Sequence, residues 1–237
     1  MSSSGLPDMP SGADRARQDE PETRKFRLSK LEIVISVLLA VALVAVVAAL
    51  YIMKSPAADR TSALSSLKVI NLELTQFDQD YGRFPDTSTI ASVRAATGTT
   101  IALGTRTSND FFRQLVADGK TSEKLFWAPV LDNRRGPNDI LGDNALAKGE
   151  CIHSYVAGLS GNDEPETPIA MAPMIPGTTR FDPDPYNSQA VILRIDGSAM
   201  PVPIKTDTNE VRLNGKNLFD PSQPYWNGKA PDLKWPE

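Results

Sequence analysis

The longest apolar segment of the chain lies near its N-terminus, at residues 33–53, with the sequence IVISVLLAVALVAVVAALYIM. Only Ser36 and Tyr51 interrupt the otherwise apolar residues. About 20 apolar residues in a helix, each rising about 1.5 Å, cover the roughly 30 Å hydrocarbon core of a bilayer. The pattern therefore predicts a transmembrane helix over residues 28–54. The polar, charge-mixed residues 1–27 before it predict a disordered tail.

A second helix is predicted after the span, because apolar residues recur at steps of three and four and so share one face. These positions are Leu64, Leu67, Ile70, Leu74, Phe77 and Tyr81. Pro56 is expected to kink the helix or to lie in a short linker. Gly82 is expected to end it, because glycine readily adopts the left-handed backbone of a helix C-terminus. We expect a stalk helix over residues 55–85 that continues the span as one long, bent rod.

The apolar face of this stalk has two interpretations. It is either a surface for packing against other subunits or the face that covers the sheet of the same chain. We favour the second interpretation.

Residues 86–237 are expected to form a small α+β head. A short helix is predicted over residues 109–117, capped by Ser108 or Asn109, and a strand over residues 151–157. Asp196-Gly197, between the β-forming residues 190–195 and 198–204, is a strong hairpin signal. Pro201 and Pro203 lack a backbone N–H at alternate positions, so the second arm is expected to be an edge strand. From Thr208 onwards we expect loops.

The expected fold class is thus α+β, with a long N-terminal transmembrane and amphipathic helix packed on a small antiparallel β-sheet head with a loop-rich C-terminus. The basic residues near the span favour a cytoplasmic N-terminus and an extracytoplasmic head. Before the span these residues are Arg24, Lys25, Arg27 and Lys30, and after it Lys54 and Arg60 are diluted by Asp59.

A cleaved secretory signal is the alternative to a retained anchor, with Ser55 and Ala57 as the small residues of a cleavage site. Signal peptides have a short basic lead and an apolar region of about 7–15 residues. Here the lead is about 30 residues and the apolar segment is longer than that range, so retention is favoured.

The composition excludes several classes of function. The formal net charge is −4 and the pI is about 5.2, so nucleic acid is not an expected partner. Cys151 is the only cysteine, which excludes an internal disulfide framework and a cysteine metal cluster. His153 is the only histidine, and a Cys151–His153 nucleophilic pair is conceivable. A lone cysteine is more often a small buried apolar residue, and we expect no enzyme.

The order of elements resembles the type IV pilin and type II secretion pseudopilin superfamily. The resemblance is carried by the apolar helix with a glutamate at its start, by Asp80-Tyr81-Gly82-Arg83-Phe84-Pro85 at the end of the stalk, and by the hairpin centred on Ile195-Asp196-Gly197-Ser198. It implies a non-enzymatic, single-pass structural subunit of the bacterial inner membrane with a periplasmic C-terminal domain. Such a subunit is a minor or accessory part of a type II secretion or pilus-like assembly. Its partners are the lipid bilayer, other pseudopilins and inner-membrane secretion proteins.

Glu32 is the residue that the resemblance assigns to assembly, as the charge that sets the register between subunits. In the family a glycine precedes the processing site, whereas this chain has Arg27 at that position. Ser29 and Glu32 also have the spacing of a capping box, which starts a helix without any assembly role. If the chain is not processed, the remaining interpretation is a membrane-tethered binding module that recognises glycan or protein through loops carrying Trp127, Trp226 and Trp235.

A calcium site is the one cofactor that the resemblance suggests, since some pseudopilins hold calcium in a loop near the C-terminus. Asp182 and Asp184 are the candidate ligands, with Asn162, Asp163 and Glu164 as further oxygen donors. Calcium takes six to eight oxygens. Asp-Pro repeats are also ordinary turn sequences, so both interpretations stand.

Overall fold

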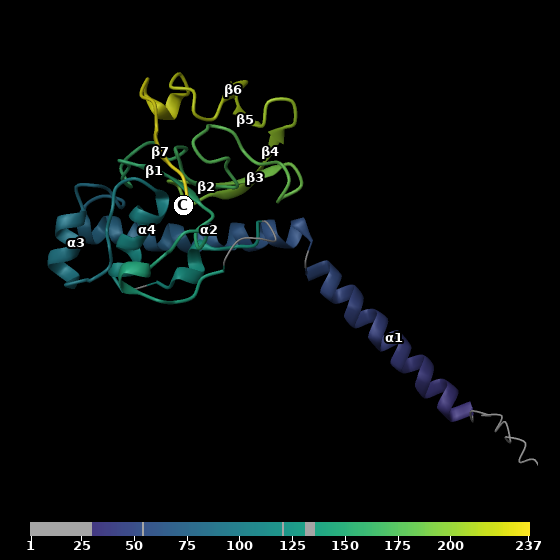
Figure 1. The fold of residues 1–237 in the computed structure, drawn as a ribbon. Coiled ribbons are helices and arrows are strands. Elements are labelled where there is room, and N and C mark those ends of the chain that lie inside the picture. Colours follow the sequence, from purple (N-terminus) through teal and green to yellow (C-terminus); the bar gives the residue numbers. More distant parts are fainter. Residues whose placement is uncertain (1–29, 54, 120, 131–135) are drawn as a thin grey trace, which may run out of the picture. The chain divides into compact units, whose positions relative to one another are not determined.

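The computed structural model describes residues 30–53, 55–119, 121–130 and 136–237, and divides the chain into two compact units, residues 1–48 and 49–237 (Figure 1). The expected tail, residues 1–27, and Ser29 lie outside the described residues, as does the side chain of Glu32. The roles proposed for Ser29 and Glu32 therefore stay predictions.

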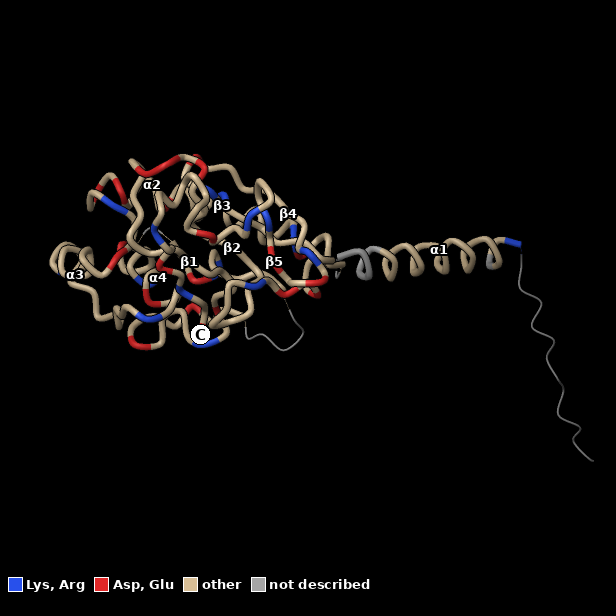
Figure 2. The backbone as a smooth tube through the Cα atoms, turned by 90° about the horizontal axis from the view of Figure 1, so that it is seen from above, with Lys and Arg blue, Asp and Glu red and all other residues tan. Residues whose placement is uncertain are grey.

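Helix α1 (Lys30–Met53) carries apolar side chains on every side over its described part. Eleven large aliphatic side chains between residues 33 and 47 are 48–67% exposed. Figure 2 shows no charged residue along the described part of α1 beyond Lys30 at its start. Within the described part of the chain, no helix meets both the length and the apolarity that a membrane span requires.

Helix α2 (Pro56–Tyr81) begins as a new helix. Ser55, with φ −80° and ψ 145°, is its N-cap, and its side chain accepts a hydrogen bond from the Ala58 N–H at 3.3 Å. Pro56 occupies the first helical turn, where its missing N–H costs nothing. The predicted interruption of the helix at Pro56 is therefore confirmed. The helix ends as predicted at Gly82, with φ 80° and its N–H donating to the Asp78 carbonyl.

The described residues of the second unit contain two further α-helices and three short 3-10 helices. The α-helices are α3 (Ile90–Thr97) and α4 (Ser108–Ala117), and the 3-10 helices are η1 (Glu123–Phe126), η2 (Gly142–Asn144) and η3 (Pro224–Trp226). Helix α4 matches the predicted helix, but neither Ser108 nor Asn109 caps it. Thr107 does, in a capping box with Asp110.

The strands form one seven-stranded antiparallel sheet in the order β6-β5-β4-β3-β2-β1-β7, which confirms the α+β class (Figure 1). They are β1 (Ser154–Ala157), β2 (Pro168–Ala172), β3 (Gln189–Arg194), β4 (Ala199–Lys205), β5 (Glu210–Leu213), β6 (Lys216–Asn217) and β7 (Asp232–Lys234). The expectation of loops from Thr208 onwards is wrong where β5, β6 and β7 form. β7 pairs with β1 at one edge of the sheet. Its three residues are too few to favour a strand by themselves, so the hydrogen bonds to β1 stabilise it.

The predicted hairpin is confirmed as β3 and β4, joined at Asp196-Gly197. Pro201 lies opposite Val191, and Pro203 lies opposite Gln189. Because backbone N–H groups alternate in direction along an antiparallel strand, and the Ile204 N–H donates to the Ser188 carbonyl, the two proline nitrogens face away from β3. On that side β5 pairs only at Ile204 and Lys205, so β4 is an edge over most of its length.

The sheet separates two hydrophobic cores, because successive residues of a strand point to opposite faces. In β1, Tyr155 and Ala157 belong to the core shared with α2, α3 and α4, whereas Val156 belongs to the other core. Residues Ala63, Leu67, Ile70, Leu74 and Phe77 of α2 lie in the first core, so the interpretation that this face covers the chain's own sheet is confirmed. Phe219, Tyr225 and Trp226 belong to the second core.

Candidate functional sites

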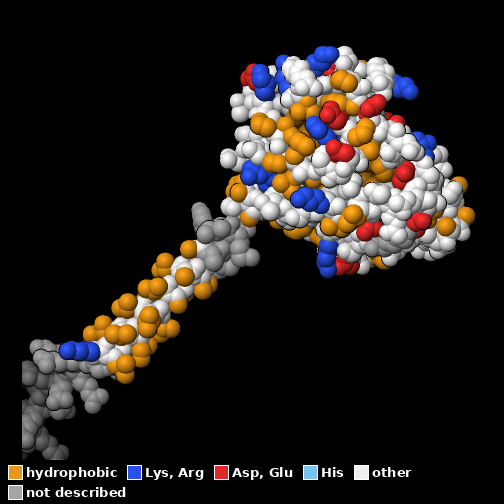
Figure 3. All heavy atoms as spheres, turned by 180° about the vertical axis from the view of Figure 1, so that it is seen from behind, with side chains coloured by type: hydrophobic (Ala, Val, Ile, Leu, Met, Phe, Trp, Pro, Cys, Tyr) orange, Lys and Arg blue, Asp and Glu red, His pale blue; other side chains and the backbone are white. Residues whose placement is uncertain are grey.

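The described surface of α1 is the first candidate site. Its exposed aliphatic side chains occupy successive positions over residues 33–47 and so lie on all sides of the helix. The orange spheres along α1 in Figure 3 show them on the face in view. By contrast, α2 buries one stripe and exposes mostly polar residues, with Val69 and Leu72 as its exposed large apolar side chains. A helix that is apolar on all sides is suited to surroundings without water.

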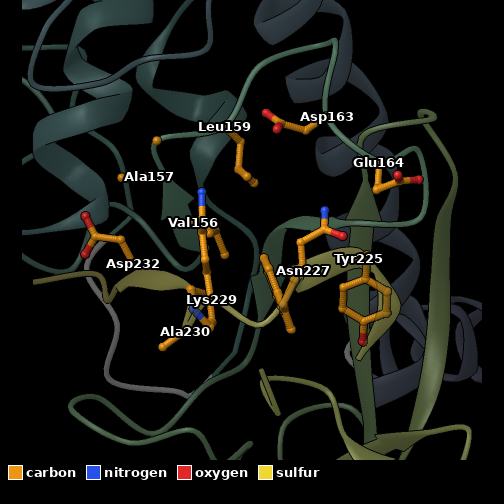
Figure 4. Close-up of a pocket in the computed structure, with 13 residues that line it drawn as sticks. Val156, Ala157, Leu159, Asp163, Glu164, Tyr225, Asn227, Lys229, Ala230 and Asp232 are labelled. Carbon is orange, nitrogen blue, oxygen red and sulfur yellow. The ribbon is translucent and has the colours of Figure 1, made fainter. Parts of the chain in front are cut away.

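The second candidate is a half-open cavity of about 240 Å³ in the second unit (Figure 4). It lies where the end of β1 and the loop of residues 158–164 meet the segment that joins η3 to β7. The residues that line it are Val156, Ala157, Gly158, Leu159, Asp163, Glu164, Tyr225, Trp226, Asn227, Lys229, Ala230, Pro231 and Asp232. Segments about 70 residues apart in the sequence thus form one hollow.

The inner wall of this cavity is apolar. Val156 and Trp226 are 1% and 5% exposed, and Leu159 packs against both hydrophobic cores. The Trp226 Nε1–H donates to the Leu218 carbonyl at 2.8 Å, and the Tyr225 hydroxyl donates to the same carbonyl at 3.1 Å. Burial raises the pKa of Tyr225 to about 12. Both aromatic side chains therefore use their polar atoms inside the protein.

Charged side chains line the mouth of the cavity. Figure 4 shows the carboxylates of Asp163 and Glu164 on one side and that of Asp232 on the other. Asp163 Oδ2 accepts from the Ser160 backbone N–H at 2.7 Å and from its hydroxyl at 3.1 Å, which fixes the loop. Asp232 forms an ion pair with Lys234 at 2.8 Å. The Glu164 backbone carbonyl accepts from the Thr167 N–H, whereas its carboxylate has no hydrogen-bond or ion-pair partner among the residues that the structure describes.

The structure does not place Cys151 and His153 as a catalytic pair. Both are fully buried, and neither lies in β1, which begins at Ser154 and so is shorter than the predicted strand. The Cys151 thiol lies 3.6 Å from the His153 backbone oxygen, to which it donates. The two imidazole nitrogens have no hydrogen-bond partner among the described residues. Burial lowers the pKa of His153 to about 3, so the ring is neutral at pH 7.

The Asp182–Asp184 segment forms a turn. The Asp184 backbone N–H donates to Asp182 Oδ1 at 3.1 Å, which is the turn interpretation of an Asp-Pro sequence. Asp163, a further predicted oxygen donor, lies in the cavity mouth. Among the described residues, no group of three or more His, Cys, Asp or Glu side chains is arranged to hold a metal ion. The calcium site therefore stays a prediction, on Asp182 and Asp184 alone.

The three tryptophans proposed for a recognition surface have different environments. Trp226 is buried in the second core, whereas Trp127 and Trp235 are partly exposed. The Trp235 Nε1–H donates to the Thr178 carbonyl at 2.9 Å, which ties the C-terminal segment to the loop after β2. Of the three, Trp226 alone lines the cavity.

The sequence points to Asp163 and Glu164 as oxygen donors for calcium and to Trp226 as part of a recognition surface, but it does not group the three residues. Lys229 and Asp232 were not identified, because nothing in the local sequence brings residues 225–232 next to residues 156–164. The pairing of β7 with β1 does so.

Comparison with known protein families, with characterised proteins and with solved structures found no match to this chain.

Proposed function

We propose that the chain is a non-enzymatic, membrane-anchored structural subunit of the pseudopilin type, a minor or accessory part of a type II secretion or pilus-like assembly. In this proposal α1 spans the bacterial inner membrane, the N-terminus is cytoplasmic and residues 55–237 lie in the periplasm. The observation that carries the proposal is the apolar surface on all sides of α1 over residues 33–47, in which Ser36 is the one polar residue.

Exposed aliphatic side chains are less stable in water than in lipid, so α1 is more stable inside a membrane than in water. Burying a large aliphatic side chain contributes about 1.5–3 kcal/mol, so eleven exposed ones in water cost on the order of 20 kcal/mol. Lipid removes this cost. The helix also satisfies its own backbone hydrogen bonds, as a membrane span must. Lys30 before the apolar residues and the basic residues of the tail favour the cytoplasmic side for the N-terminus.

The second unit supports the pseudopilin type in particular. An amphipathic helix, α2, packs on an antiparallel sheet and ends at Gly82-Arg83-Phe84-Pro85, the turn that carries the resemblance. The hairpin of β3 and β4 follows later in the chain, as the resemblance implies. The partners in the proposal are therefore lipid, other pseudopilins and inner-membrane secretion proteins.

Alkaline carbonate extraction of bacterial membranes tests the anchor. The full chain is expected to stay in the membrane pellet, and the double variant Val41→Lys/Val44→Lys is expected to shift to the soluble fraction. Each lysine at the centre of a span costs about 2.5–3.5 kcal/mol. The matched control is Val69→Lys/Leu72→Lys, which has the same spacing on the exposed face of α2 and should stay in the pellet. Release of the unchanged protein by carbonate would refute the anchor.

Assembly is tested separately by cysteine cross-linking in membranes. Val37→Cys is introduced in a Cys151→Ser background, so that it is the only thiol. Side-by-side packing of α1 helices predicts disulfide-linked dimers after mild oxidation. A retained anchor without any cross-linked product would instead favour a tethered binding module, for which the cavity of residues 156–164 and 225–232 is the supporting observation.

A further inference from the structure

The cavity between the β1 end and the η3–β7 segment carries an excess of negative charge. Its lining contains three carboxylates, on Asp163, Glu164 and Asp232, and one ammonium group, on Lys229. All four side chains are exposed to solvent at the mouth. Lys234 neutralises part of the Asp232 charge from outside the lining. The mouth therefore attracts cations in preference to anions.

The mouth attracts the charged part of a ligand, whereas the apolar inner wall favours contact with its hydrocarbon part. Leu159, Ala230 and Pro231 offer accessible carbon surface, whereas Val156 and Trp226 are almost fully buried in the lining. A small hydrated ion gains nothing from such a wall. A ligand with methylene groups behind its charge removes that apolar surface from water and keeps its charge at the rim, as long basic side chains do.

We propose that this cavity binds an alkyl cation, and that its occupant is the lysine or arginine side chain of a partner protein. Its volume of about 240 Å³ is below the roughly 300–1,000 Å³ of pockets for drug-sized molecules, and it suits one inserted side chain. The aliphatic stem lies along Leu159, Ala230 and Pro231, and the charged end meets Glu164 and Asp163. The site is formed entirely by the second unit, so this proposal does not depend on the insertion of α1 in a membrane.

Binding is tested with the full chain in nonionic detergent, labelled with nitrogen-15 in tryptophan. Its three indole N–H signals are recorded, and Trp226 is assigned by its loss in Trp226→Phe. The probe is N-acetyl-lysine methylamide, and the uncharged control is N-acetyl-norleucine methylamide. The lysine probe is expected to shift the Trp226 signal in a saturable way, more weakly at about 1 M salt than at about 0.01 M. The norleucine compound is expected to bind at least several-fold more weakly.

Three variants test whether the charges of the cavity determine the affinity for the lysine probe. Glu164→Gln is expected to weaken binding about two- to fivefold, the range for an exposed ion pair. Lys229→Gln is expected to strengthen binding by a similar factor, because it removes a like charge from the cavity. Glu166→Gln is the control, since Glu166 is an exposed carboxylate two residues away that does not line the cavity. It should leave the affinity unchanged.

A free amine is distinguished from a protein side chain by a further probe, n-butylammonium. Tighter binding of N-acetyl-lysine methylamide than of n-butylammonium supports a side chain of a partner, because the peptide groups then add contacts. Equal or tighter binding of n-butylammonium overturns the assignment to a partner. A Trp226 signal that does not move, equal binding of the norleucine compound, or equal effects of Glu164→Gln and Glu166→Gln would overturn the cation site itself.

Discussion

At the scale of single residues, burial decides the chemistry of this chain more than residue type does. Cys151 and His153 are two positions apart and chemically suited to a nucleophilic pair, yet both lie in the interior. The thiol donates to a backbone oxygen, and the imidazole is held neutral. Asp163 and Glu164 are ordinary loop residues by sequence, yet they face a cavity with an apolar wall. Which polar residues are accessible is a property of the packing.

His153 is expected to make the folded state sensitive to acid. Its pKa is about 3 in the folded protein against an ordinary value of 6.5, so between these pH values the unfolded chain binds a proton that the folded chain does not. The free energy of unfolding should therefore fall as the pH is lowered from about 6.5 to about 3, by up to about 5 kcal/mol from this residue. Urea denaturation at a series of pH values measures it.

The control for this prediction is His153→Phe, which keeps an aromatic ring and removes the titrating group. The difference in unfolding free energy between the two proteins should change with pH over that same interval. Parallel curves for the two proteins would show that His153 is not the source of the acid sensitivity.

At the scale of elements, helices α2 and α4 and the β3–β4 hairpin follow from local patterns, and the short strands do not. Helix α2 has an apolar stripe, a proline in its first turn and a glycine at its end, and all three signals agree. The β3–β4 hairpin has a turn sequence between two β-forming segments. In contrast, β6 has two residues and β7 has three, too few to show any periodicity, and they exist because a neighbouring strand pairs with them. The short helix α3 was not predicted either.

The buried stripe of α2 gives a direct test with two leucines on one helix. Leu74 is fully buried, whereas Leu72 is 65% exposed. Leu74→Ala is expected to lower the free energy of unfolding by about 2–5 kcal/mol, because it leaves a cavity in the first core. Leu72→Ala should change it by less than about 0.5 kcal/mol. Similar losses for both variants, measured by chemical denaturation, would mean that α2 does not pack on the sheet in this orientation.

The end of α2 depends on backbone freedom at Gly82. With φ 80° this position is left-handed, and a Cβ atom there would meet no neighbour within 4 Å. Gly82→Ala should therefore lower the free energy of unfolding by about 1–2 kcal/mol through backbone strain alone. Gly82→Asn should cost less, since asparagine tolerates this conformation better. Thermal unfolding of the three proteins compares them, and an alanine variant as stable as the asparagine variant would contradict the strain argument.

At the scale of the whole molecule, the second unit has what it needs to fold without α1. Both hydrophobic cores are built from residues between 63 and 235, on the two faces of one sheet. Leu233 in the C-terminal segment belongs to the second core. The Glu237 carboxylate accepts from Arg113 at 3.3 Å and from Thr107 at 3.1 Å, beside the start of α4. None of these contacts involves α1.

Residues 55–237 produced alone are therefore expected to be soluble and to unfold cooperatively. The unfolding midpoint should lie within a few degrees of that of the second unit in the full chain in detergent. Size-exclusion chromatography and circular dichroism check both expectations. An aggregated or unfolded product would mean that the second unit needs α1, and would contradict the division at residue 48.

The sequence by itself determined the features that one segment encodes alone: the apolar segment of α1, the amphipathic stripe and glycine end of α2, and the Asp-Gly hairpin. Each depends on residues within one or two helical turns or across one tight turn, where the period of apolar positions and the backbone preferences of glycine and proline act directly. Tertiary structure alone decided the seven-stranded order, the capture of β7 by β1, the burial of Cys151 and His153, and the cavity whose walls come from residues 156–164 and 225–232. These depend on contacts between segments far apart in the chain, and no local pattern records which distant segment will pack against which.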